Sequence, residues 1–186
     1  MGNIISCDPG SPMGSAIFSP HGKLLKASQI VCEGNALYLE RLQKIKKHNS
    51  IDIAFIEDYY HFPGVVQKCS FSIKEQIGLL KAVFPDFIII HTKQWNPYDW
   101  QEAYKRLVAM DIFGREFDSG HTTDAALMGN NIFQKAQVGI GEETFQALKW
   151  LAQTKRIWPK NHDQSLYILW NEYKDSISST SGNEAA

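Results

Sequence analysis

The chain has 186 residues, and its 19 lysines and arginines against 20 aspartates and glutamates give a formal net charge of −1. This balance excludes a protein that holds polyanions through bulk charge alone. Because 44% of the residues are apolar, the chain can bury a full hydrophobic core, which excludes wholesale disorder and a mini-fold that depends on disulfides.

The N-terminal part predicts three consecutive strands and a helix. An apolar run at residues 3–7 ends at Asp8-Pro9-Gly10, and two further strands are expected at 14–18 and 23–30. Apolar residues at helical spacing then predict an amphipathic helix over 35–49.

Two later strands are almost continuously apolar. The first covers 51–56 and is followed directly by Glu57, and the second covers 87–90. Such runs are typical of central parallel strands covered on both faces, so we expect a carboxylate at the carboxyl end of a buried strand. Apolar spacing between the two strands predicts a helix over 73–84.

Four helices are expected in the second half of the chain. Asn96-Pro97 supplies an N-cap and a first-turn proline for the first, whose apolar stripe lies between Trp100 and Val108. The second covers 121–134. Two amphipathic helices follow, around 145–152 and 166–173.

The order of these elements predicts an α/β fold in which helices flank a mixed five-stranded sheet. We divide the chain into a domain at 1–136, a helical extension packed on it at 137–175, and a disordered tail at 176–186. No basic leader precedes a long apolar stretch, and no apolar run is long enough to span a membrane. The three cysteines are widely spaced, without the pattern of a disulfide framework or a zinc site. We therefore expect a cytoplasmic protein without membrane contact.

Four residues stand out because of where they lie. Asp8 and Glu57 each follow a predicted strand, while His121 and Asp124 are three positions apart on one face of a helix. If the first and fourth strands are parallel neighbours, Asp8 and Glu57 project side by side at the carboxyl edge of the sheet, where α/β sheets place ligands. The helix could present Asp124 to both.

Carboxylates packed at a buried edge repel one another and are costly to desolvate, so a positive partner is expected. Hard oxygen ligands favour Mg²⁺ or Mn²⁺, and a pair of such ions about 4 Å apart is a known device for phosphodiester hydrolysis. Ordinary structural roles compete with this interpretation: Asp8 as a turn residue, Asp124 as a surface helix residue, and His121 as a helix-start or core histidine. Asp118 is expected as a helix N-cap and is the reserve ligand.

Three segments around these residues, IISCDPGSPMGSAIF, IDIAFIEDYY and HTTDAA, resemble the active-site segments of RuvC-type Holliday junction resolvases, in the RNase H-like superfamily, and we expect a bacterial or phage protein. The resemblance implies an RNase H-like fold and a Mg²⁺-dependent endodeoxyribonuclease that acts in DNA recombination and repair. It makes Asp8, Glu57 and Asp124 the metal-binding carboxylates, with two ions per site and Mn²⁺ as a substitute. His121 stands where the family carries a carboxylate or a histidine, so it could bind metal or orient water or phosphate.

DNA contacts must come from local patches, because the net charge offers no general attraction. Three cations are candidates for phosphate contacts: Lys93, Lys105 and Arg106. Three aromatic residues shortly after Glu57 could stack on bases or wedge open a junction: Tyr59, Tyr60 and Phe62. The segment 155–160 mixes cations with an indole and is a further candidate contact. Solvent-facing lysines and core packing of a ring are the competing interpretations.

A four-way junction is two-fold symmetric and its resolution requires paired nicks, so we expect a homodimer, as the resemblance also implies. The helix at 73–84 is a candidate interface, although core burial explains its apolar stripe equally well. Two other functions stay open: an RNase H-like nuclease acting on hybrids, flaps or other branched nucleic acids, and a non-catalytic DNA-binding relative. An actin-like nucleotide binder is weaker, because it would need a second copy of the domain.

Overall fold

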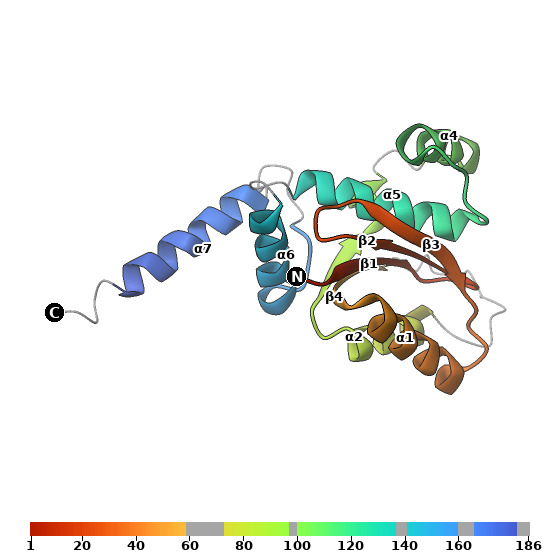
Figure 1. The fold of residues 1–186 in the computed structure, drawn as a ribbon, viewed down its shortest axis with the longest axis horizontal. Helices are drawn as coiled ribbons and strands as arrows, with labels where there is room; N and C mark the ends of the chain where they lie inside the picture. Colours follow the sequence, from red (N-terminus) through yellow and green to blue (C-terminus); the bar gives the residue numbers. More distant parts are fainter. Residues whose placement is uncertain (59–72, 97–99, 137–140, 160–165, 182–186) are drawn as a thin grey trace.

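The centre of the protein, in a computed structural model, is a mixed sheet (Figure 1). The structure describes the chain except for residues 59–72, 97–99, 137–140, 160–165 and 182–186. The strands of the described part are β1 (Asn3–Asp8), β2 (Met13–Phe18), β3 (Leu24–Ile30), β4 (Ile51–Asp58) and β5 (Phe87–His91). They lie in the order β3-β2-β1-β4-β5. Strand β1 is antiparallel to β2 and parallel to β4, and β4 is parallel to β5, which confirms the predicted parallel pair.

Helices cover both faces of the sheet. Helices α1 (Asn35–Asn49) and α2 (Ile73–Val83) lie on one face, and α5 (Gly120–Lys135) crosses the other (Figure 1). Consecutive residues of β1 show why apolar residues point to both of its sides: Ile4 belongs to the core under α5, and Ile5 to the core under α1 and α2. Both are fully buried, as alternation in a strand covered on both sides requires.

Helix α2 is part of this core. Its apolar residues Ile77 and Leu80 pack with Tyr38 of α1 against the sheet. The apolar stripe of α2, which the sequence offers as a candidate dimer interface, therefore packs in the core of the same chain.

The prediction for the region after β5 is wrong in its boundaries. The chain first forms a single turn, α3 (Thr92–Trp95), and the longer helix α4 begins later (Glu102–Phe113) with Gln101 as its N-cap. The side-chain oxygen of Asn96 instead accepts a hydrogen bond from the Trp100 backbone N–H at 2.9 Å. Pro97 lies outside the described residues.

The apolar stripe assigned to this helix is also largely exposed. Tyr104 and Leu107 have 52% and 69% of their surface accessible, whereas Ala109 is buried and Lys105 is mostly covered. Helix α4 packs on α5 rather than on the sheet, so only a narrow face is covered. The spacing of apolar residues therefore predicted the wrong face of α4 as the buried one.

The C-terminal extension consists of α6 (Glu142–Thr154) and α7 (Leu166–Ser181). Helix α6 packs against β4 and β5, and α7 extends away from the body of the molecule (Figure 1). Helix α7 continues to Ser181, inside the segment 176–186 that the sequence predicts as a tail. The Ser178 hydroxyl donates to the Lys174 carbonyl at 2.9 Å, a bond within the helix.

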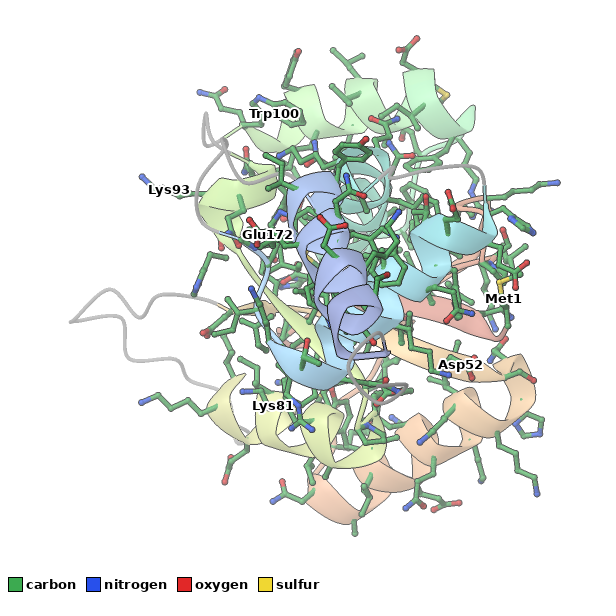
Figure 2. All side chains as sticks on the ribbon, turned by 90° about the vertical axis from the view of Figure 1, so that its left-hand side faces the viewer. Met1, Asp52, Lys81, Lys93, Trp100 and Glu172 are labelled. Carbon is green, nitrogen blue, oxygen red and sulfur yellow. The ribbon has the colours of Figure 1, made fainter. Side chains whose placement is uncertain are left out.

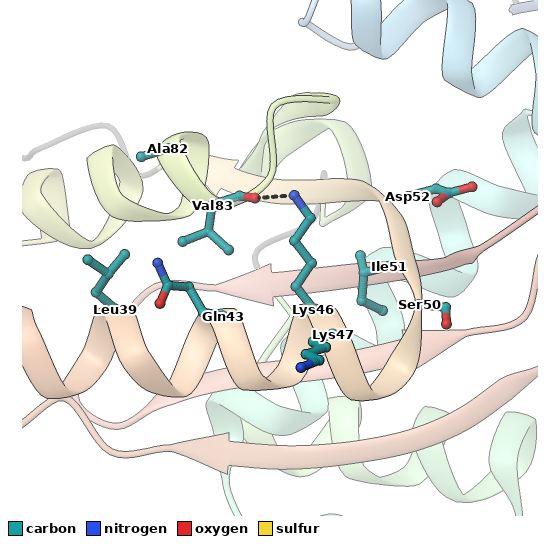
Figure 3. Close-up of a pocket in the computed structure, with 9 residues that line it drawn as sticks. All are labelled: Leu39, Gln43, Lys46, Lys47, Ser50, Ile51, Asp52, Ala82 and Val83. Atoms are coloured by element: carbon teal, nitrogen blue, oxygen red, sulfur yellow. Dashed lines mark hydrogen bonds between the residues drawn. The ribbon is translucent and has the colours of Figure 1, made fainter.

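A pocket of about 700 Å³ lies between α1, α2 and the start of β4 (Figure 3). Lys46 spans it and donates to the Val83 carbonyl at 2.7 Å. Its lining includes Ile51, the first residue of β4, so the pocket is at the edge of the sheet opposite Asp8. Within the described residues, no helix is long and apolar enough to cross a membrane.

Candidate active site

Asp8 and Glu57 end the two central strands side by side. The parallel register pairs Cys7 of β1 with Ile56 of β4, so the next residue of each strand is a carboxylate at the same edge. Both carboxylate residues are completely buried. Burial, and then the negative charge of Asp8, raise the pKa of Glu57 well above its usual value. The pair therefore resists carrying two negative charges without a positive partner.

The first turn of α5 brings His121 and Asp124 to this edge. Its N-cap is Ser119, whose hydroxyl accepts from the Thr122 N–H at 3.2 Å; the predicted cap, Asp118, lies one residue outside and is exposed. The start of the helix can lie close to β2 because Gly14 has no side chain. A Cβ at this position would collide with the His121 backbone. Gly14, the second residue of β2, thus allows the start of α5 to lie directly against the strand.

His121 contacts Asp8 directly. Its Nδ1–H donates to Asp8 Oδ2 at 2.7 Å. This hydrogen bond is the largest cause of a raised pKa for His121, which outweighs the opposing effect of burial. The contact joins residues that are 113 positions apart in the sequence and favours an imidazolium beside the buried carboxylate.

Asp124 is paired with a cation that sequence reasoning assigned to DNA. Lys105 of α4 donates to Asp124 Oδ2 at 2.7 Å, and only 12% of its side chain is exposed. Its ammonium also lies 5.4 Å from the centre of the Trp95 ring. Burial raises the pKa of Asp124 to about 6, and Lys105 opposes this rise. Lys105 is thus an internal partner of the acidic cluster rather than part of an open basic surface.

Two residues that sequence reasoning missed hold Glu57. The Trp95 indole N–H donates to Glu57 Oε1 at 3.0 Å, and the Thr92 side chain also hydrogen-bonds Glu57. Both belong to α3, which directly follows β5 at the same edge of the sheet. The sequence did contain a signal for them. Thr92 and Trp95, two side chains that can donate hydrogen bonds, follow within five residues of the apolar strand β5, the neighbour of β4.

The remaining oxygens of the cluster test whether the site fits a metal ion. Asp8 Oδ1, Glu57 Oε2 and Asp124 Oδ1 are buried and have no hydrogen-bond partner among the described residues. An unpaired buried acceptor costs about 1–3 kcal/mol, more when charged, so each of these oxygens is a candidate donor to a cation. Carboxylate oxygens are the donors that Mg²⁺ and Mn²⁺ prefer. The donor set therefore fits a hard divalent ion.

The side chains do not form a closed coordination shell. In the described part of the chain, no three His, Cys, Asp or Glu side chains are grouped closely enough to hold one ion. His121 holds the second oxygen of Asp8, and Lys105 holds that of Asp124. One oxygen of Asp8 and one of Asp124 are therefore already bonded to groups of the protein.

The other predicted DNA contacts are dispersed or not described. Lys93 extends from the surface of α3 (Figure 2), and Arg106 is exposed and lies 3.4 Å from Glu102. The three aromatic residues after Glu57 lie outside the described residues: Tyr59, Tyr60 and Phe62.

The ion pair of Asp124 yields a first prediction. Lys105→Met keeps side-chain length but removes the cation, so the pKa of Asp124 should rise further above about 6 in the metal-free protein. We also expect the free energy of unfolding to fall by about 1–3 kcal/mol, because a mostly buried charged hydrogen bond is lost. Carbon NMR titration of the Asp124 carboxyl and chemical denaturation measure the two effects.

Arg106→Gln is the matched control, because its pair with Glu102 is exposed on both sides and should contribute little. An unchanged Asp124 titration in the Lys105 variant would contradict its assigned role.

Comparison with known proteins identifies the class of fold. No protein-family model and no curated protein matches the sequence. Solved structures do match: Thermus thermophilus RuvC in complex with a Holliday junction substrate has a TM-score of 0.57 at 12% identity, over 74% of this chain and 96% of that chain.

A second Thermus thermophilus RuvC structure has a TM-score of 0.54 at 13% identity, over 74% of this chain and 97% of that chain. The Fowlpox virus resolvase with Holliday junction DNA has a TM-score of 0.46 at 14% identity, over 78% and 98% of the two chains. The two RuvC structures, at such low identity, show a common fold and no more, and the predicted RNase H-like α/β fold is confirmed.

Proposed function

We propose that this chain is a divalent-metal-dependent endonuclease that cuts branched DNA, with the four-way Holliday junction as its substrate. The observation that carries the proposal is the buried cluster of Asp8, Glu57 and Asp124, each with one oxygen that lacks a partner among the described residues. The shared fold with RuvC supports it, since one of the matching RuvC structures is bound to a Holliday junction.

In this proposal, Asp8, Glu57 and Asp124 hold Mg²⁺, for which Mn²⁺ substitutes, with two ions per site. When bound, such ions lower the pKa of an attacking water and stabilise the leaving oxygen of a phosphodiester. His121 keeps Asp8 oriented through its 2.7 Å hydrogen bond, and its second ring nitrogen could orient water or phosphate. Lys105 keeps positive charge beside Asp124.

Substrate contacts and assembly are part of the same proposal. Lys93 and Arg106 are exposed and could contact phosphates, and the aromatic segment after Glu57 stays a predicted wedge. Paired nicks in a two-fold symmetric junction favour a homodimer. The apolar stripe of α2 packs in the core, so a second copy that binds this helix would contact its exposed polar face. A bacterial or phage origin and a cytoplasmic location stay predictions.

A cleavage panel tests the proposal. We expect Mg²⁺ to support symmetric paired nicks in a four-way junction, faster than any cut in an RNA/DNA hybrid, a flap or a linear duplex, and EDTA to abolish them. A preference for linear duplex would overturn the resolvase assignment, and a preference for hybrids would favour ribonuclease H activity. Junction binding without cleavage of any substrate would favour the non-catalytic alternative.

A further inference from the structure

The single turn α3 gives Glu57 its hydrogen bonds on one side. The Trp95 N–H donor is on a ring that is 1% exposed, and it meets Glu57 Oε1 at 3.0 Å. Thr92, at the other end of the turn, also bonds Glu57. Glu57 Oε2 is left buried without a partner among the described residues. One oxygen is therefore held by the protein, and the other is available to a ligand.

Gln94 connects this turn to the C-terminal extension. Its side-chain oxygen accepts from the His91 N–H at 2.8 Å, which fixes the start of α3. Its side-chain amide donates to the carbonyls of Trp158 and Pro159 at 3.1 and 3.0 Å. One side chain thus joins the end of β5, the start of α3 and a segment more than sixty positions away.

That distant segment is docked on the open edge of the sheet. The Ile89 N–H donates to the Arg156 carbonyl at 2.8 Å, and the Trp158 N–H donates to the Ile89 carbonyl at 2.9 Å. The bridge between Ile89 and Ile157 is parallel, so residues 156–158 extend the sheet beside its edge strand β5.

The docking changes the interpretation of 155–160 as a DNA contact. The Trp158 indole is 6% exposed and belongs to the core under α5, and the Arg156 guanidinium lies 5.0 Å from the centre of the Phe87 ring. The indole is therefore used for anchoring, and the segment after α6 acts as a structural strap.

We propose that α3 is a positioning element for the acidic site: Trp95 and Thr92 hold Glu57 so that Oε2 stays available to a divalent cation, and Gln94 ties this arrangement to the C-terminal strap at 156–159. The inference rests on the proposed function and assigns a role to the extension beyond the nuclease core. Trp95, Thr92 and Gln94 are positioning residues, since they act through Glu57.

The physical reason is the freedom of a glutamate side chain. Three rotatable bonds let either oxygen turn toward the cluster, and a turn costs little unless donors hold one oxygen. The indole is a rigid donor with one N–H, and a hydrogen bond to an ionised carboxylate is about twice as strong as a neutral one. Loss of a hydrogen-bond partner of a metal ligand typically weakens metal affinity by about 10–100-fold.

Trp95→Phe tests the indole N–H with little loss of ring packing. In the full-length protein we expect Mn²⁺ affinity, measured by isothermal titration calorimetry, to fall by about 10–100-fold, with a parallel loss of cleavage at limiting metal. Trp150→Phe is the matched control, because Trp150 packs with Trp170 and Tyr173 between α6 and α7. Its Mn²⁺ affinity should equal that of the wild type.

Two further variants keep the test decisive if Trp95→Phe folds poorly. Thr92→Val is nearly isosteric and should also weaken Mn²⁺ binding. Gln94→Ala should weaken it through the strap, whereas Gln153→Ala should not: Gln153 also ties the extension to the sheet, through a 2.9 Å bond to Asp86, but next to the opposite end of β5.

The outcomes separate the two proposals. If the wild-type protein neither binds Mn²⁺ nor cuts DNA, the nuclease assignment fails and the positioning role fails with it. If the wild type binds Mn²⁺ and the Trp95, Thr92 and Gln94 variants bind it equally well, the positioning role is wrong while the nuclease assignment stands. If Gln153→Ala weakened Mn²⁺ binding as much as Gln94→Ala, the strap would contribute only to general stability and its link to Glu57 would be wrong.

Discussion

Asp8→Asn is expected to abolish junction cleavage, by about a thousandfold or more, while junction binding is retained. Asparagine matches aspartate in shape, and its Oδ1 can still accept the hydrogen bond from His121 Nδ1–H. It removes the negative charge at the centre of the buried cluster, where a bound divalent ion would contribute several kcal/mol to the transition state. At about 1.4 kcal/mol per tenfold change in rate, such a loss corresponds to this factor.

Asp52→Asn is the matched control for this experiment. Asp52 accepts a hydrogen bond from the Gly2 N–H at 2.7 Å and lies at the opposite edge of the sheet, in the lining of the pocket shown in Figure 3. Binding is measured by gel shift in EDTA, and cleavage by single-turnover kinetics in Mg²⁺. Unchanged cleavage by the Asp8 variant would remove Asp8 from the mechanism, and lost binding would indicate a role in DNA contact instead.

The convergence of Asp8 and Glu57 could be predicted because two general rules determine it. Apolar runs identify buried strands, and parallel neighbours end at the same edge. The register of Cys7 with Ile56 is what these rules require. Helical spacing likewise places His121 and Asp124 on one face of α5, and the glycine that leads β2 allows the close approach of that helix.

The polar surroundings of the cluster could not be predicted, because they depend on packing between helices. Lys105 lies beside an apolar stripe, and the period of the sequence would turn that stripe inward. Instead α4 rests on α5, which exposes Leu107 and directs Lys105 to Asp124. The orientation of Trp95 could not be predicted either, because the four-residue helix α3 is too short to show a pattern of apolar spacing.

Glu57→Gln should likewise abolish cleavage, and it should also make the metal-free protein more stable at neutral and alkaline pH. The folded-state pKa of Glu57 is raised above its unfolded value, first by burial and then by the charge of Asp8. A group of this kind contributes stability at pH values below its unfolded pKa, and that stability is lost as the pH rises through the folded pKa. Glutamine does not ionise, so the loss disappears.

The local hydrogen bonds favour the same result. Glutamine keeps an oxygen that can accept from the Trp95 N–H, and its amide could donate to Asp8 Oδ1, which has no partner among the described residues. Each kcal/mol gained at the melting temperature raises Tm by about 2–4 °C for a chain of this size. Thermal denaturation at about pH 4 and about pH 8, on either side of the ordinary glutamate range, should show the Tm difference between variant and wild type growing with pH.

Added Mg²⁺ distinguishes the loss of the buried Glu57 carboxylate from the loss of a carboxylate on the surface. The metal should raise the Tm of the wild type, because it binds the folded state, and should raise that of the Glu57 variant far less. Glu116→Gln, at an exposed position, should change neither Tm nor cleavage. A Glu57 variant that is less stable at every pH would mean that the carboxylate is structurally satisfied as it stands. A more stable and inactive variant would mean that the fold tolerates a costly buried charge because a bound cation offsets it, which is the trade between stability and activity expected of an active site.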